Sequence, residues 1–144
     1  MHVPLDERTQ RWSEAAATDL AVAERLRCEA PHLSCFHAQQ SAEKALKASL
    51  TRRSGDAPPI HALARLLDAL DAMSVPIPES VRDSAESLDK YDLPTRYPDA
   101  LGFADAAIAY KPRDADAALS AARAVLAWAR EDVASLQAAE PGPP

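Results

Sequence analysis

The chain has 144 residues and a formal net charge of −6, and 47% of its residues are hydrophobic. This length allows one domain with a substantial core but excludes two such domains. The acidic balance argues against a general basic coat for nucleic acid, although it leaves room for a local basic pocket. Ala is the commonest hydrophobic residue, only 3 residues are Gly, and the 12 Pro fall mainly between patterned segments, which favours an all-α fold.

The N-terminal segment MHVPLDERTQRW is charged and has no apolar signal-peptide core, and no apolar run of about 18 residues occurs in the chain. We therefore expect a cytoplasmic protein that does not associate with a membrane. Cys28 and Cys35 are expected to be reduced thiols, because no CxxC pair or Cys/His cluster with metal-ligand spacing is present. The sequence predicts neither a metal ion nor another cofactor.

Periodic apolar positions, broken at Pro and Gly, predict a single helical domain over residues 1–138 and a flexible C-terminal tail at 139–144. The five helices are expected at about residues 6–29, 33–53, 61–73, 78–93 and 113–137. Met73 is expected on the core face of the third helix. Trp128 lies nearly opposite the apolar arc of the last helix, so it is expected at the surface, unless the N-terminal segment covers it.

Asp19 interrupts the apolar stripe of the first helix. A buried carboxylate requires a partner, because an unpaired buried charge is costly. Lys44 or Lys47 of the second helix could supply that partner, and the alternative is that Asp19 reaches solvent near the end of the stripe.

The second helix carries the most distinctive stretch, FHAQQSAEKALKASL at residues 36–50, which is rich in strong helix formers. One arc of this helix consists mostly of small residues, so another helix backbone can approach it closely. Beside that arc runs a polar ridge of Gln39, Glu43 and Lys47, which predicts either a second buried surface or a site. Glu43 precedes Lys47 in the favourable order for an ion pair on a helix, although an exposed pair of this kind implies no function.

His61 stands at the predicted start of the third helix. It could act as a general base or a phosphate ligand, or it could anchor the preceding loop by a hydrogen bond, and we favour the anchor. Further along, Pro98 in TRYPDALGF places Arg96 and Tyr97 at a helix break, with Asp99 capping the segment that follows.

The order of these motifs resembles the HEPN family (higher eukaryotes and prokaryotes nucleotide-binding), in particular its small prokaryotic single-domain members. The motifs are W-x6-DL-x2-A from Trp12 to Ala23, FHAQQSAEKALKASL, P-x-I-H-x-L from Pro58 to Leu63, and TRYPD at 95–99, and the resemblance spans about residues 11–136. It implies a five-helix, largely up-and-down bundle that forms homodimers, with a cleft lined by the second helix and the RYPD segment. It also implies a minimal nucleotidyltransferase partner in a toxin–antitoxin-like pair.

Many members of that family are metal-independent ribonucleases, whose signature is an Arg followed by a His after four to six residues. The chain departs from this signature. If Arg96 is the signature arginine, the possible His positions hold Leu101, Gly102 and Phe103, none of which can exchange a proton. Phe103 also stands where one toxin branch has a tyrosine.

The resemblance therefore implies a binding surface more than a catalytic centre. We expect the ligand- or partner-binding residues to be Arg96, Tyr97, Asp99, Gln39, Gln40, Glu43, Lys44 and Lys47. The ligand would be a nucleotide, an RNA or the nucleotidyltransferase, and Arg96 could instead hold the interface by pairing with Glu43 or Asp99. One alternative is a ribonuclease toxin in which Arg96 works with a non-standard histidine, His61 or His37. Another alternative is a purely structural oligomerisation module.

Overall fold

The computed structural model describes residues 4–91 and 109–139, and within these ranges the chain forms α-helices and one short 3-10 helix but no strand. The elements are α1 (Leu5–Arg25), α2 (Pro31–Ser54), α3 (Leu63–Ala72), α4 (Glu79–Leu88), the 3-10 helix η1 (Asp89–Tyr91) and α7 (Pro112–Ala138). The five α-helices of the described ranges confirm the predicted all-α architecture. None of them is long and apolar enough to cross a membrane.

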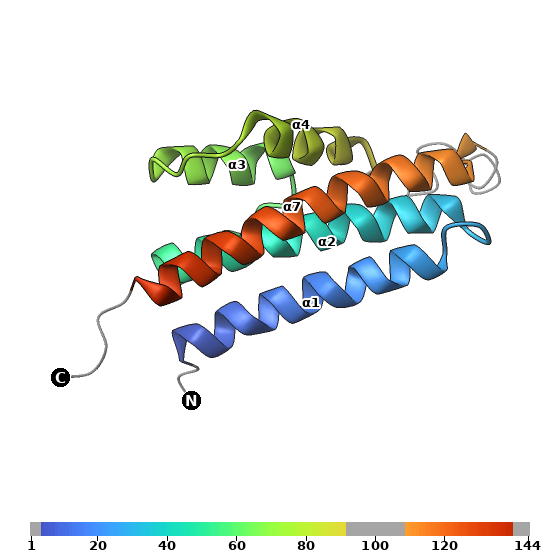
Figure 1. The fold of residues 1–144 in the computed structure, drawn as a ribbon. Helices are drawn as coiled ribbons and strands as arrows, with labels where there is room; N and C mark the ends of the chain where they lie inside the picture. The colour runs from blue at the N-terminus through green and yellow to red at the C-terminus, as the bar shows by residue number, and fades with distance from the viewer. Residues whose placement is uncertain (1–3, 92–108, 140–144) are drawn as a thin grey trace.

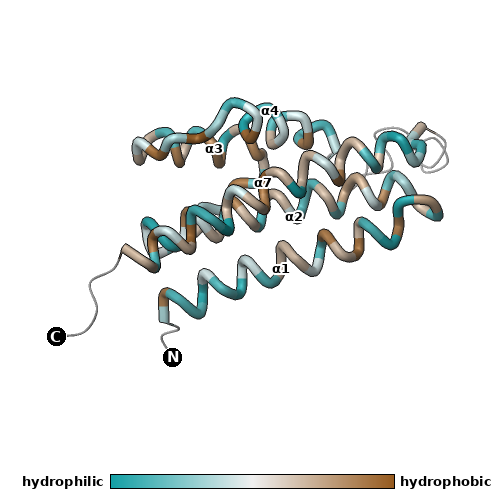
Figure 2. The backbone as a smooth tube through the Cα atoms, viewed as in Figure 1, coloured by the Kyte–Doolittle hydropathy of each residue, from teal (hydrophilic) through white to brown (hydrophobic). Residues whose placement is uncertain are grey.

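The three long helices lie side by side, and the two short ones cover them. Figure 1 shows α1, α2 and α7 as three long rods, with α3 and α4 placed over α2 and α7 on the side away from α1. Helix α2 packs against α1, α7 and α3, so it is the central element of the bundle. Hydrophilic and hydrophobic segments alternate along the long helices in Figure 2, as an amphipathic pattern requires.

The small-residue arc of α2 forms the centre of the core, as predicted. Its members are at most 3% exposed: Cys35, Ala38, Ala42, Ala45, Leu46, Ser49 and Leu50. The four leucines of α3 are fully buried, and Val81, Ala85, Leu88 and Tyr91 reach the core from α4 and η1. Both cysteines are free thiols, and burial raises the pKa of Cys35 to about 12, which keeps this thiol protonated.

The prediction that Met73 faces the core is wrong, and the surface position expected for Trp128 is met only in part. Met73 is 40% exposed, because α3 ends at Ala72 and Met73 is its C-cap, outside the helix whose leucine face enters the core. Trp128 is partly buried and packs against the core cluster. The apolar arc of α7 is wider than the sequence stripe suggested, because α7 has α1, α2 and α4 as neighbours.

The helix boundaries differ from the predicted ones by a few residues. Helix α1 ends at Arg25 instead of Glu29, and α2 begins at Pro31, whose missing N–H costs nothing in the first turn. His61 lies before α3 and not inside it. The start of α3 is capped from a distance, because the Asp89 carboxylate accepts hydrogen bonds from the backbone N–H groups of Leu63 (2.6 Å) and Ala64 (3.0 Å).

Gly55 ends α2 in the left-handed conformation, with φ of 88°. We expect Gly55→Ala to lower the free energy of unfolding by about 1–2 kcal/mol, because a side chain disfavours this backbone conformation. A Cβ atom built at Gly55 has no atom within 4 Å, so steric overlap adds nothing to that cost. Urea unfolding followed by circular dichroism measures the change. An unchanged midpoint would mean that the left-handed cap contributes nothing to stability.

Candidate functional site

The polar ridge of α2 is buried inside a single chain. Gln39, Glu43 and Lys47 are 0%, 3% and 5% exposed. Lys47 Nζ lies 3.2 Å from Glu43 Oε2, so the pair is an internal ion pair and not a pair on the helix surface. Charges are rarely buried to this extent without a structural or functional reason.

Helix α1 supplies a further contact to this ion pair. Lys47 Nζ lies over the Trp12 indole, 5.4 Å from the ring centroid, which is a cation–π geometry. Trp12 therefore covers one side of the ridge. The sequence predicted only that Trp12 belongs to the apolar stripe of α1, and not that it contacts Lys47. The only sequence signal was its position on the α1 face that also carries Asp19.

The other end of the ridge fixes the segment that leads into α3. The Gln39 side-chain amide donates to the His61 carbonyl (3.3 Å), and Gln40 donates in turn to Gln39 Oε1 (2.7 Å). His61 Nδ1 lies 3.4 Å from Glu43 Oε2, while the imidazole remains 59% exposed. These are the contacts of a histidine that anchors a loop, and they also aim an imidazole at solvent with a carboxylate behind it.

Glu43 has spare hydrogen-bonding capacity. Its Oε2 atom serves both Lys47 and His61, whereas Oε1 is buried and has no hydrogen-bond partner among the described residues. A buried carboxylate oxygen in this state can accept a hydrogen bond from a ligand, a partner chain or another part of this chain.

A second ion cluster joins α1 and α2. Asp19 is 8% exposed, and its two carboxylate oxygens contact Lys44 Nζ (2.5 Å) and His37 Nδ1 (3.0 Å). Lys44 is therefore the charged partner that the sequence predicted for a buried Asp19. As a result, both lysines of the predicted site, Lys44 and Lys47, already neutralise a carboxylate of the same chain.

The remaining predicted site residues, Arg96, Tyr97 and Asp99, lie outside the described residues. The structure brings together Gln39, Gln40, Glu43, Lys47 and His61, and it assigns Lys44 to the separate cluster with Asp19. Among the described residues no group of three His, Cys, Asp or Glu side chains is arranged to hold a metal ion.

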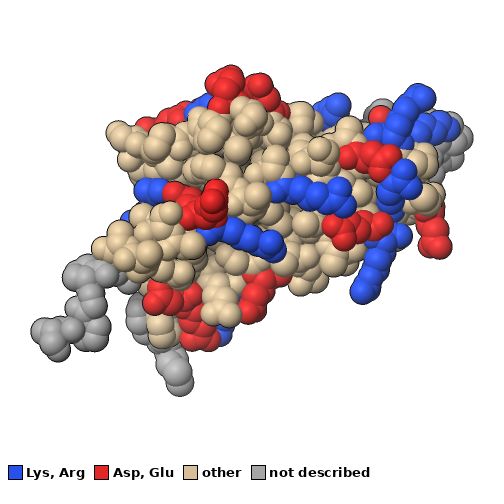
Figure 3. Space-filling model, in the orientation of Figure 1, with Lys and Arg blue, Asp and Glu red and all other residues tan. Residues whose placement is uncertain are grey.

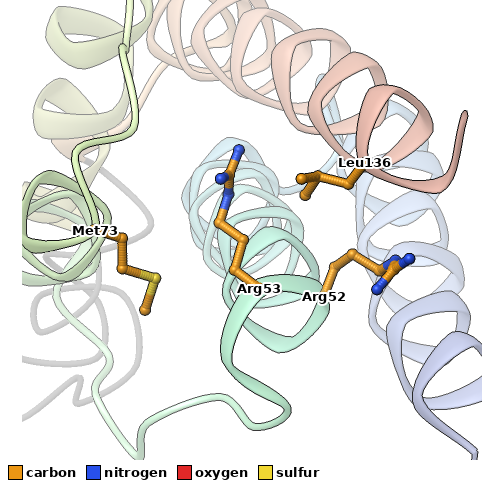
Figure 4. A pocket seen from close by; sticks show the side chains of 4 residues that line it. All are labelled: Arg52, Arg53, Met73 and Leu136. Carbon is orange, nitrogen blue, oxygen red and sulfur yellow. The ribbon is translucent and has the colours of Figure 1, made fainter. Parts of the chain in front are cut away.

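A surface hollow lies at the C-terminal end of α2. It has a volume of about 450 Å³ and is lined by Arg52, Arg53, Met73 and Leu136, which Figure 4 shows around the end of α2 and the last turns of α7. Its cations have acidic partners: Arg53 forms a two-point contact with Asp132, and Arg52 Nε lies 3.7 Å from an Asp6 oxygen. The hollow therefore has no excess of positive charge to offer an anion.

The described helices form an all-α bundle centred on α2. The HEPN domain family matches residues 9–132, and the chain belongs to this family. Among solved structures, TT1696 from Thermus thermophilus is 37% identical, with a TM-score of 0.78 over 87% of this chain and 98% of that one. ST0689, an archaeal HEPN homologue, is 30% identical, with a TM-score of 0.71 over 87% of this chain and 97% of that one. No curated protein matches the chain.

Proposed function

We propose that this HEPN protein is a homodimeric binding subunit that pairs with a minimal nucleotidyltransferase in a toxin–antitoxin-like module. The observation that carries the proposal is the charge state of the α2 surface. Lys44 is bound to Asp19 and Lys47 to Glu43, so neither lysine contributes a free positive charge. Binding to RNA phosphates depends on free positive charges, because Lys and Arg side chains displace the counterions condensed on the RNA and the release of these counterions supplies much of the affinity. A protein partner is therefore the ligand that this surface favours over an RNA backbone.

The wider surface supports the same choice. Figure 3 shows acidic and basic side chains next to each other over one face of the molecule, with Lys and Arg most numerous toward the end where α7 begins. Two of the arginines near that end are paired with carboxylates, Arg27 with Asp116 and Arg123 with Glu24. A mixed surface of this kind suits protein recognition, where charge pattern determines which partner fits.

The partner would engage the side of α2 where Gln40 and His61 reach solvent. Glu43 lies behind these two residues with its Oε1 atom buried, so the partner would contact Gln40 and His61 directly and Glu43 only through His61. In this proposal Arg96, Tyr97 and Asp99 complete the binding surface, with Arg96 as the main donor.

The experiment is co-expression with the nucleotidyltransferase-like product of the adjacent gene. We expect the two proteins to copurify, and light scattering after gel filtration to report two copies of this chain in the complex. Arg96→Ala should weaken the complex at least tenfold, since a charge-assisted contact is lost. Arg65→Ala removes an exposed arginine of α3 and serves as the control. If the purified protein does not bind the nucleotidyltransferase, the proposal is wrong.

A ribonuclease that uses Arg96 with His61 is the second candidate, and the Glu43–His61 contact favours it. A carboxylate behind an imidazole orients the ring and stabilises its protonated form, as general-base catalysis requires. RNA incubated with the purified protein and EDTA tests this function. We expect no cleavage. Cleavage that disappears in both Arg96→Ala and His61→Gln would replace the binding proposal with the enzymatic one. If the protein neither cleaves RNA nor binds RNA, a nucleotide or the nucleotidyltransferase, the remaining function is that of an oligomerisation module.

A further inference from the structure

Four side chains form a continuous path from the surface at His61 to the indole of Trp12. His61 Nδ1 and Lys47 Nζ both approach Glu43 Oε2, at 3.4 Å and 3.2 Å. The Lys47 ammonium also stands 5.4 Å from the centroid of the Trp12 ring. The two ends of the path come from different neighbours of α2, because Trp12 belongs to α1 and His61 to the segment before α3. The path therefore joins two parts of the molecule through the side chains of α2.

The two ends of this path are accessible, whereas its middle is buried. The His61 side chain is 59% exposed, and Trp12 is half-buried at the wall of a hollow of about 340 Å³ between α1 and the end of α2. Glu43 and Lys47 are almost completely buried. Charges interact more strongly in a protein interior than in water, so the buried ion pair responds to a change of charge at its accessible end.

The Glu43 carboxylate has room for a second cation. Its Oε2 atom serves both neighbours, while Oε1 is buried and has no hydrogen-bond partner in the described part of the chain. An ionised carboxylate accepts hydrogen bonds on both oxygens. Hydrogen bonds between ionised groups are shorter and stronger than neutral ones, so the long contact to His61 should tighten when that ring gains a charge.

The charged groups around His61 identify the carboxylate that would respond to this change. Histidine is the side chain that ordinarily changes charge between about pH 5 and 8. Glu43 and Lys47 reach the imidazole from α2. The carboxylate of Asp89, from η1, binds the first two backbone N–H groups of α3. Asp89 is thus already committed, and Glu43 is the carboxylate in contact with the ring.

The cation that faces the indole is Lys47. Arg8 and Arg11 stand beside Trp12 on α1, but Arg8 donates to a backbone carbonyl at the end of α2 and Arg11 is paired with Glu7. The Lys47 ammonium lies over the ring itself. A movement of this ammonium changes the electrostatic environment of the indole directly.

We propose that His61, Glu43 and Lys47 form a proton-linked relay that controls the contact between Lys47 and Trp12. Protonation of the His61 ring draws the Glu43 carboxylate toward it, weakens the hold of Glu43 on Lys47, and lets the ammonium move relative to the indole. Loss of the proton restores the Glu43–Lys47 pair. By linkage, a carboxylate of a partner bound at His61 shifts the relay in the same direction as acid. The relay itself operates in the isolated chain, so it does not rest on the proposed partner.

The test is a titration of the purified protein between about pH 8 and pH 5, followed by NMR. The indole N–H signal of Trp12 is observed by ¹⁵N NMR and distinguished from that of Trp128 with Trp128→Phe. The ring C–H signal of His61 is assigned by its loss in His61→Gln. We expect the Trp12 signal to shift with the same midpoint as the His61 signal, because one proton drives both changes.

Variants identify the members of the relay. His61→Gln, at an exposed position, should abolish the titration of the Trp12 signal. The matched control is His37→Gln, which removes the histidine that contacts Asp19 in the other ion cluster and should leave the Trp12 titration unchanged.

The double variant Glu43→Leu with Lys47→Met removes both charges of the buried pair and keeps His61. In this variant His61 should still titrate, but the Trp12 signal should no longer follow it. The comparison separates the relay from a direct effect of the His61 charge on the indole.

Three results would overturn the relay: a Trp12 signal that stays constant while His61 titrates, a Trp12 titration that persists in His61→Gln, or one that persists in the folded double variant. If the double variant does not fold, the two histidine variants decide, and loss of the Trp12 titration in His37→Gln as well as in His61→Gln would also overturn the relay. None of these measurements involves the nucleotidyltransferase, so the relay and the proposed function can fail separately.

Discussion

Replacing Lys47 with Met is expected to lower the free energy of unfolding by about 3–5 kcal/mol. Met fills much of the same volume but removes the ammonium that lies 3.2 Å from the Glu43 carboxylate. Glu43 is 3% exposed and one of its oxygens already has no partner among the described residues, so the variant leaves a buried charge supported only by His61 at 3.4 Å. Urea unfolding followed by circular dichroism measures the loss.

A double-mutant cycle separates the ion pair from general damage to the core. Glu43→Leu with Lys47→Met removes both charges, and we expect this double variant to recover most of the stability lost in Lys47→Met. The matched control is Arg11→Met, which breaks the pair with Glu7 at the same helix spacing on the exposed face of α1 and should cost less than about 0.5 kcal/mol. If Lys47→Met costs no more than Arg11→Met, the ridge is solvated in solution and cannot be a buried part of the site.

The helices could be predicted because the signals for them are local. Proline and glycine mark the breaks, and the spacing of apolar residues identifies the face of each helix that enters the core. Errors arise where a distant residue decides the outcome. Asp89 caps α3 from far along the chain, so nothing near His61 indicates that the helix begins at Leu63.

The site was less predictable for a related reason. The spacing of Gln39, Glu43 and Lys47 showed that they share one side of α2, but it could not show whether another helix covers that side. Trp12 covers it from α1, and His61 approaches from the segment before α3. Both contacts depend on how the helices pack. The predicted roles of Arg96, Tyr97 and Asp99 remain predictions, because those residues lie outside the described ranges.

The same packing explains why α2 carries small residues where a typical core helix carries large ones. Helix α2 has neighbours on nearly all sides, and Ala38, Ala42 and Ala45 are 0–3% exposed. Small side chains let the neighbouring helix axes lie close together, and the backbone hydrogen bonds of each helix are unaffected by this approach. The close approach is what positions Trp12 over Lys47 and Asp19 beside Lys44, so the alanine arc fixes the geometry of both ion clusters.

Ala42→Leu should therefore be among the most damaging single substitutions in the chain. Ala42 is 0% exposed, and the added atoms have no space unless the adjacent helices move apart. We expect a loss of about 3 kcal/mol in the free energy of unfolding, at the upper end for overpacking of a core. The matched control is Ala127→Leu on the exposed side of α7, which should change stability by less than about 0.5 kcal/mol. Equal stability of the two variants would show that α2 is loosely packed, and the fixed positions of Trp12 and Asp19 would then need another cause.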